Sequence, residues 1–271
     1  MQGSSRVAAA KGQEVLDGIL GDGVDTATLA DELFAATSAI DGSAALRRAL
    51  ADPSGEGEAK RGLAIRVFGG KLSDPAVRLV GELAAQRWTA DRDLTDTLEG
   101  LAVQAILAGA ERDGRIDQVE DELFRFERAV AADAGLRDAL SIRNTDASGK
   151  TGLVRTLLSG KASAETIRLA SQAASAPRGR KIERTLEEYL RLAAVRRDQL
   201  TAVVTSAVHL DEQQQARLRS ALEGIYRKTV VLQTIVDPEV VGGIHVRVGD
   251  EVVDGTIARR IDEARRHVAG S

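Results

Sequence analysis

The sequence predicts a mainly α, α+β fold, in which two tandem, related helical bundles are followed by a small C-terminal mixed α/β domain. Three observations lead to this prediction. Only 3% of the 271 residues are aromatic while 43% are hydrophobic, which suits helices packed through alanine and leucine. Matching segments recur at a fixed spacing in the helical part of the chain. Near the end of the chain, β-branched residues alternate with polar ones, the pattern of strands.

The two helical segments are predicted to be copies of one sequence, because matches recur at an offset of 90 residues. Residues 46–50 (LRRAL) meet residues 136–140 (LRDAL), and the tetrapeptide DELF occurs at both 31–34 and 121–124. This period is too long for a solenoid repeat and suits a bundle that has been duplicated once.

The copies set the expected domain boundaries. The first bundle spans 1–110, the second spans 111–200, and the C-terminal domain spans 201–271. The helix near 97–110 aligns with residues 7–20 at the same offset. We therefore expect it to serve both as the last helix of the first bundle and as the first helix of the second.

Each copy reads as a series of helices separated by capping and helix-ending residues. Asp25 is a suitable N-cap, Gly69-Gly70 ends a helix, and Pro75 occupies a permitted first turn. The helices expected in the first copy span 7–20, 25–40, 43–51, 57–68, 73–86 and 92–110. The second copy is expected to repeat this series from about Asp117 and to end in a long helix over 180–203.

The chain after residue 200 predicts a small mixed sheet with helices against it. Ile244, Val246 and Val248 alternate with His245 and Arg247, so the two sets face opposite sides of a strand. The expected elements, in order, are a strand over 201–207, a helix over 211–226, strands over 229–236, 244–248 and 251–253, and a helix over 256–268. The apolar stripe expected on the helix over 211–226 consists of Ala216, Leu218, Leu222 and Ile225.

Charge and composition argue against several kinds of partner and cofactor. The formal net charge is −4, so nucleic acid is not an expected partner, and the basic run 178–184 is expected to be a solvated helix start. The chain has no cysteine, and His209, His245 and His267 lack metal-ligand spacing, so no metal or cofactor is expected. No apolar run approaches the ~20 residues of a membrane span. Direct membrane insertion is therefore not expected.

One alternative function is a nucleotide-binding enzyme that uses a degenerate phosphate loop at Ser148-Gly149-Lys150-Thr151. A phosphate loop needs a glycine where Asn144 stands, and it follows a strand rather than the helical residues 136–140. A helix start with an exposed glycine and lysine is the favoured interpretation.

A second alternative is a generic helical interaction scaffold with a calcium-dependent hinge near Asp113. Residues 111–120 place carboxylates at several ligand positions of a calcium loop, but Gly109 stands at the first of them. An acidic turn between two helices, with Asp117 capping the second, is the favoured interpretation.

The C-terminal segment carries an ordered set of turn and charged residues. They are Asp237, Pro238, Gly242, Gly243, Arg247, Gly249, Asp250, Asp254 and Gly255. This set resembles the signature of the delta subunit of F-type ATP synthases, the family of the mitochondrial oligomycin-sensitivity-conferring protein. The resemblance covers about 203–268 directly, and Thr256 stands where that family usually has serine. The second bundle resembles the extended, duplicated form of actinobacteria, either free-standing or as the delta part of a fusion.

The resemblance implies a non-catalytic stator subunit on the cytoplasmic face of the membrane. In that family the helical bundle binds the N-terminal helices of the alpha subunits, and the C-terminal domain binds the b-type subunit of the peripheral stalk. These contacts resist rotor torque, so that proton translocation drives ATP synthesis. The chain is then expected to be one copy in a hetero-oligomeric complex.

The resemblance also implies apolar grooves for a partner helix, with one candidate set in each copy. In the first copy the set is Val7, Val15, Ile19, Val77, Val80 and Leu83. In the second copy it is Leu101, Ala105, Ile106, Ile167, Leu169 and Ala170. For each of these residues the alternative is that it fills the core of its own bundle. The sequence leaves open which copy holds the alpha helix.

Overall fold

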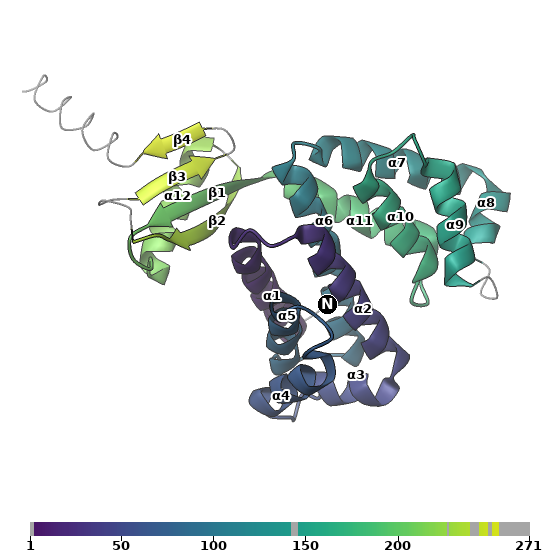
Figure 1. The fold of residues 1–271 in the computed structure, drawn as a ribbon, viewed down its shortest axis with the longest axis horizontal. Coiled ribbons are helices and arrows are strands. Elements are labelled where there is room, and N and C mark those ends of the chain that lie inside the picture. Colours follow the sequence, from purple (N-terminus) through teal and green to yellow (C-terminus); the bar gives the residue numbers. More distant parts are fainter. Residues whose placement is uncertain (1–2, 142–145, 227, 239–243, 249–250, 255–271) are drawn as a thin grey trace, which may run out of the picture. The chain divides into compact units, whose positions relative to one another are not determined.

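A computed structural model describes residues 3–141, 146–226, 228–238, 244–248 and 251–254. The chain forms two compact units. The first comprises Met1–Leu16 and Asp25–Arg197, and the second comprises Asp17–Val24 with the chain from Asp198 on. Strands form a sheet in the second unit, whereas helices build the first (Figure 1). The predicted mainly α, α+β class is confirmed. Within the described ranges, no helix is both long and apolar enough to cross a lipid bilayer.

The helical unit holds the two predicted series of helices, except for the end of α1 from Asp17 on, which belongs to the second unit. The first series is α1 (Ser4–Gly21), α2 (Thr26–Gly42), α3 (Ala44–Ala51), α4 (Gly57–Phe68), α5 (Asp74–Ala85) and α6 (Asp91–Arg112). The second is α7 (Ile116–Ala132), α8 (Ala134–Ser141), α9 (Ala147–Leu158), α10 (Ala164–Ser175) and α11 (Ile182–Arg197). The prediction that the last helix runs to residue 203 is wrong. It ends at Arg197, because the β-branched residues beyond it pair with a second strand.

Two carboxylates stabilise helix starts in different ways, one as an N-cap and one from within the first turn. Asp25 caps α2 as predicted, since its carboxylate accepts hydrogen bonds from Ala27 N at 3.1 Å and Thr28 Oγ1 at 2.6 Å. The hydrogen bonds from Thr28 and Ala27 lower the pKa of Asp25. Asp117 does not cap α7, contrary to the prediction. It lies in the first turn of the helix, where a carboxylate stabilises the positive end of the helix dipole instead.

The two copies share an interaction that joins α2 to the start of α5 in the first copy and α7 to the start of α10 in the second. Ser73 N donates to Glu32 Oε1 at 2.8 Å, and 90 positions on Ser163 N donates to Glu122 Oε2 at 2.8 Å. In each copy the serine hydroxyl donates to the same glutamate. The repeated pair supports the duplication. The boundary between the two bundles stays a prediction, because both copies lie in one compact unit.

Replacing Glu122 with glutamine is expected to cost about 1–2 kcal/mol at pH 7, because the hydrogen bonds to a charged acceptor weaken. Burial raises the pKa of Glu122, but hydrogen bonds from Thr166 and Ser163 outweigh it and hold the pKa below 4.5. A lowered carboxyl pKa stabilises the fold above the unfolded pKa, and this stability is lost as the pH falls through the folded pKa. Urea denaturation should therefore show a difference between wild type and Glu122→Gln that shrinks below pH 4.5.

Glu14→Gln is the control for this pH series, since Glu14 pairs only at the surface with Lys11, one helical turn away. Its cost should stay below about 0.5 kcal/mol at every pH. If the loss in free energy of unfolding caused by Glu122→Gln did not change with pH, the charged form of Glu122 would not be what stabilises the fold.

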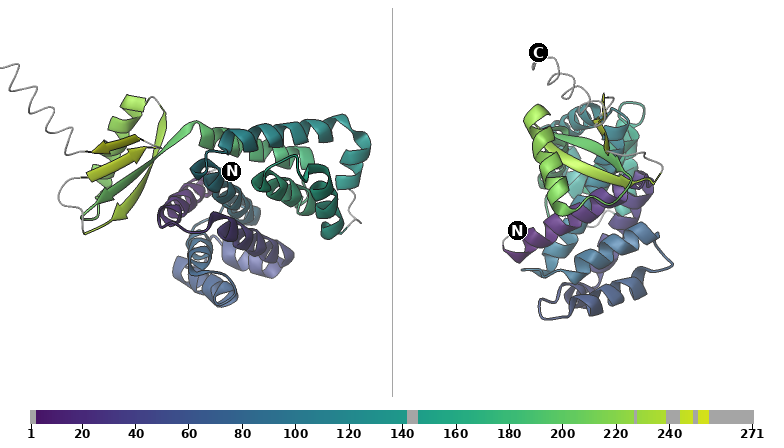
Figure 2. Two further views of the ribbon diagram at one scale, coloured as in Figure 1. Left: turned by 45° about the horizontal axis from the view of Figure 1, so that its top comes forward. Right: turned by 90° about the vertical axis from the view of Figure 1, so that its left-hand side faces the viewer.

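The second unit contains the predicted mixed sheet. Its elements are β1 (Gln199–Ser206), α12 (Glu212–Tyr226), β2 (Thr229–Val236), β3 (Ile244–Val248) and β4 (Glu251–Asp254). The strand order is β2-β1-β3-β4, with β1 and β2 parallel and the other pairs antiparallel. Leu222 of α12 packs with Val204, Val230 and Val246, so the helix covers one face of the sheet (Figure 2).

The predicted faces of this unit are partly right. Val246 and Val248 are buried while Arg247 is exposed, which confirms the alternation along β3. On α12, Leu218 and Leu222 face the sheet as predicted, but Ala216 and Ile225 are exposed. The face of α12 that packs on the sheet is rotated from the predicted one. It consists of Leu218, Leu222 and Tyr226, and Ile225 does not belong to it.

Part of the predicted signature and the final predicted helix, 256–268, lie outside the described residues. So do the signature residues Gly242, Gly243, Gly249, Asp250 and Gly255. Of the others, Asp237 follows β2, and its backbone N–H donates to Ser206 O at 2.9 Å, which closes the end of the β1–β2 pair. Asp254 is the last residue of β4.

Candidate functional site

The first candidate surface lies on the first copy, where α1 packs against α5. Of the candidate residues there, Val77, Val80 and Leu83 are buried, Val15 is half-buried, and Val7 is 70% exposed. Ile19 is also buried, but it belongs to the other compact unit. The contact between the helices is close, because a Cβ on Gly12 would lie 2.5 Å from Leu83 Cδ2.

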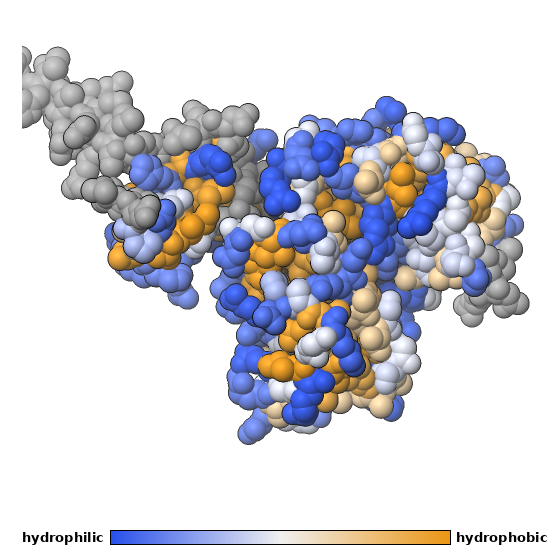
Figure 3. All heavy atoms as spheres, viewed as in Figure 1, coloured by the Kyte–Doolittle hydropathy of each residue, from blue (hydrophilic) through white to orange (hydrophobic). Residues whose placement is uncertain are grey.

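Figure 3 shows apolar atoms gathered over the part of the first bundle where α1 and α5 lie. Packing within the bundle accounts for the buried members of the set. Val7 and Val15 are the members that a partner helix can reach directly.

The corresponding set in the second copy lies on α6 and α10. Leu101, Ala105 and Ile106 of α6 are buried, as are Leu169 and Ala170 of α10. Ile167 is half-buried. Leu101 packs toward α1 of the first copy, because a Cβ on Gly12 would lie 3.1 Å from Leu101 Cδ1. Ile167 alone of this set offers appreciable surface.

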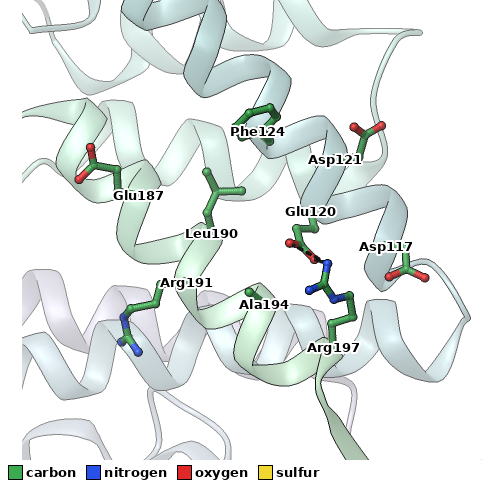
Figure 4. Close-up of a pocket in the computed structure, with 9 residues that line it drawn as sticks. All are labelled: Asp117, Glu120, Asp121, Phe124, Glu187, Leu190, Arg191, Ala194 and Arg197. Atoms are coloured by element: carbon green, nitrogen blue, oxygen red, sulfur yellow. Dashed lines mark hydrogen bonds and ion pairs between the residues drawn. The ribbon is translucent and has the colours of Figure 1, made fainter.

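A groove that sequence reasoning missed runs between α7 and α11 of the second copy (Figure 4). Its volume is about 560 Å³. Phe124, Leu190 and Ala194 give it an apolar lining. The charged residues around them are Asp117, Glu120, Asp121, Glu187, Arg191 and Arg197. Phe124 is 52% exposed.

The position of Phe124 in the sequence could have predicted this groove. The apolar positions of α7 that face the core are Val119, Leu123, Phe126 and Val130. Phe124 lies beside this stripe rather than in it, next to the exposed Arg125. A large aromatic residue outside a helix's core-facing stripe is a candidate contact residue.

Buried charges join the two copies elsewhere in the helical unit. Glu99 of α6 is 2% exposed and accepts hydrogen bonds from Arg178 Nη1 at 2.6 Å, Arg180 Nη2 at 2.7 Å and Tyr189 Oη at 2.8 Å. Arg178 also pairs with Asp41 of α2. Burial and the Glu99 charge raise the pKa of Tyr189 well above its usual value. The prediction that the run 178–184 is solvated is wrong for Arg178, because its guanidinium completes this network.

The geometry around Lys150 does not support a phosphate site. The carboxylate of Asp146 already occupies the start of α9, where Gly149 N donates to it at 2.6 Å. Lys150 is buried, as is its counterpart Lys60, whose Nζ donates to the carbonyl oxygens of Asp52 and Gln86. A phosphate at this helix start would meet a carboxylate instead of free amides.

Two carboxylates at the end of α6 and in the turn that follows it have arginine partners. Glu111 accepts from Arg196 Nε at 2.7 Å, and Asp113 pairs with Arg115 at 2.9 Å. Across the described ranges, no group of three or more His, Cys, Asp or Glu side chains is arranged to hold a metal ion. This geometry gives no support to a calcium hinge.

Comparison with known proteins identifies the family. The sequence profile described as "ATP synthase delta (OSCP) subunit" matches residues 103–268. A protein of Streptomyces griseus named ATP synthase subunit delta is 46% identical over 271 residues, which cover 100% of both chains. Relatives of the same name from Kineococcus radiotolerans and Streptomyces avermitilis are 46% and 47% identical and cover 98% or more of each chain. The chain belongs to the ATP synthase delta (OSCP) subunit family.

Proposed function

We propose that this chain links the catalytic head of an F-type ATP synthase to its peripheral stalk and holds the head against the torque of the rotor. The family is one of structural stalk subunits, so the chain is not itself an enzyme. The full-length match to relatives named ATP synthase subunit delta is the observation that carries the proposal. The arginine-paired carboxylates and the occupied start of α9 are consistent with it, because they leave no site for nucleotide chemistry there.

The head contact is assigned to the N-terminal helices of the alpha subunits. An amphipathic helix docks through apolar side chains spaced one or two turns apart. Val7 and Val15 on α1 offer accessible apolar surface at such a spacing. This surface supports the first copy as the binding site for an alpha helix.

The stalk contact is assigned to the C-terminal unit. Val208, Ile225 and Val236 are exposed apolar residues there. They give a b-type stalk helix apolar contacts without opening the core beneath the sheet. The complex that results places the chain at the cytoplasmic face of the membrane, as one copy among different subunits.

A synthetic peptide of the N-terminal segment of the alpha subunit is expected to bind the full chain and to gain helix. Val7→Asp with Val15→Asp should weaken binding by at least about tenfold, because each change removes an apolar contact worth ~1 kcal/mol or more. Calorimetry gives the affinity and circular dichroism gives the helix content. Magnesium ATP should produce no saturable binding heat in the same titration.

Ile65→Asp is the matched control for the peptide experiment. Ile65 is an apolar residue of α4 that is 49% exposed, so the substitution places an aspartate on an exposed apolar position outside α1, and each single variant on α1 is compared with it. Its peptide affinity should equal that of the wild type. An alpha peptide that neither binds nor gains helix would contradict the proposed head contact.

A further inference from the structure

The tetrapeptide Asp-Glu-Leu-Phe occurs in both copies, and the first occurrence has a partner. Arg168 of α10 donates from Nε to Asp31 Oδ1 at 2.5 Å, and its guanidinium carbon lies 5.0 Å from the centre of the Phe34 ring. An arginine that pairs with a carboxylate and stacks on a ring is held at two points. Phe34 is only 3% exposed.

The second occurrence carries the same two side chains on an open surface. Phe124 is 52% exposed. Asp121 pairs with Arg125 one turn along its own helix, and both of these side chains are more than half exposed. A surface ion pair of this kind contributes little to stability, so exchanging it for another cation costs little.

The reason for the difference is the order of the copies along the chain. The second copy follows the first and supplies Arg168 to the first copy's α2. After α11 the chain enters β1 instead of a third bundle. The groove between α7 and α11 is therefore the place where a further element would pack if the repeat continued (Figure 4).

The groove has the lining that an amphipathic helix needs. Leu190 and Ala194 lie along α11 opposite Phe124, one turn apart. Asp117, Asp121 and Glu187 place carboxylates around this apolar strip. Within the lining, Glu120 already has Arg197 as a partner at 3.0 Å. Asp121 pairs with Arg125, and Glu187 lies 3.7 Å from Arg184, both through exposed side chains. The lining still holds four carboxylates against the two guanidinium groups of Arg191 and Arg197, and this excess of negative charge favours a basic partner.

We propose that the α7–α11 groove binds an amphipathic helix from another subunit of the ATP synthase complex, and that this helix places an arginine over Phe124 and beside Asp121. The arginine takes the position that Arg168 holds on Phe34 and Asp31. The identity of the complex rests on the proposed function. The groove is distinct from the α1–α5 surface assigned to the alpha peptide.

The proposal is tested by photo-crosslinking in the assembled complex. The full chain carries p-benzoylphenylalanine in place of Phe124, is co-expressed with the other subunits, and is irradiated after purification. The crosslink is expected to map to a helical segment of another subunit that contains an arginine and apolar residues. The same amino acid in place of the exposed Ile65 is the control and should give no crosslink to that segment.

A charge exchange tests the arginine directly. Asp121→Arg should lower the crosslink yield at least fivefold, and changing the crosslinked arginine of the partner to aspartate should restore it. Restoration requires the two side chains to face each other, which a general loss of structure would not mimic.

The crosslinking results can contradict the groove proposal without contradicting the proposed function. If the chain assembles and binds the alpha peptide but Phe124 crosslinks only to residues of its own chain, or to nothing, the groove proposal alone is overturned. A crosslink to an acidic or wholly polar segment also overturns it. If the chain does not assemble with the complex at all, both proposals fail.

Discussion

Replacing Glu99 with glutamine is expected to lower the free energy of unfolding by about 3 kcal/mol, because removing one partner of a buried ion pair leaves an uncompensated charge. Glu99 accepts hydrogen bonds from two arginines and Tyr189 while it is 2% exposed. A glutamine fits the same space but is neutral, and its amide group would direct N–H donors at the two guanidinium groups. Arg178 keeps Asp41 and Asp96 as partners, which limits the loss.

Urea denaturation followed by circular dichroism measures this loss. Glu188→Gln is the matched control, because Glu188 pairs with Arg191 at 2.6 Å on the surface of α11, with both side chains about half exposed. That change should cost no more than about 0.5 kcal/mol. Equal losses in the two variants would show that the Glu99 network contributes no more than a surface pair.

The Glu99 network bears on how the helical unit transmits force. Glu99 lies on α6, Asp41 on α2, and Arg178 and Arg180 on the turn before α11, so one cluster joins both copies. Arg178 adopts a φ of 52°, in the left-handed region that costs a non-glycine residue about 1 kcal/mol. This conformation persists because the guanidinium is held by several acceptors at once. A turn held in this way resists bending between the copies.

Local signals in the sequence predicted most helix starts and ends. Asp25 caps α2 through its own carboxylate, and Gly70, with a φ of 71°, ends the turn after α4 as only glycine does readily. The C-terminal strands followed from alternation in the same way. These features depend on residues within a few positions of one another, so a single sequence carries the information.

The features that the sequence did not predict depend on distant neighbours. Arg178 belongs to a basic run with the composition of a solvated helix start, yet α2 and α6 supply the carboxylates that bury it. Ile225 fits the helical period of α12, but the sheet beneath selects the adjacent line of residues. The candidate residues at the α1–α5 contact are mostly buried, because the same apolar spacing serves a core and a groove.

The two phenylalanines of the repeated tetrapeptide should respond oppositely to truncation. Phe34→Ala is expected to cost about 3–5 kcal/mol, because the ring is buried and its removal leaves a cavity beneath Arg168. Phe124→Ala is expected to cost no more than about 0.5 kcal/mol, since the ring is half exposed at the open groove. Denaturation of the isolated full chain measures both values under one condition.

Each variant is the control for the other, because Asp-Glu-Leu precedes both rings while the elements packed against them differ. A large loss for Phe124→Ala in the isolated chain would mean that part of this chain covers the groove, and the proposed partner helix would then have no place to bind. A small loss there, together with weaker crosslinking of Asp121→Arg in the complex, would assign the ring to an interface rather than to the fold. Opposite outcomes for the two rings would thus distinguish a residue that stabilises the fold from a counterpart that is available for contact with a partner.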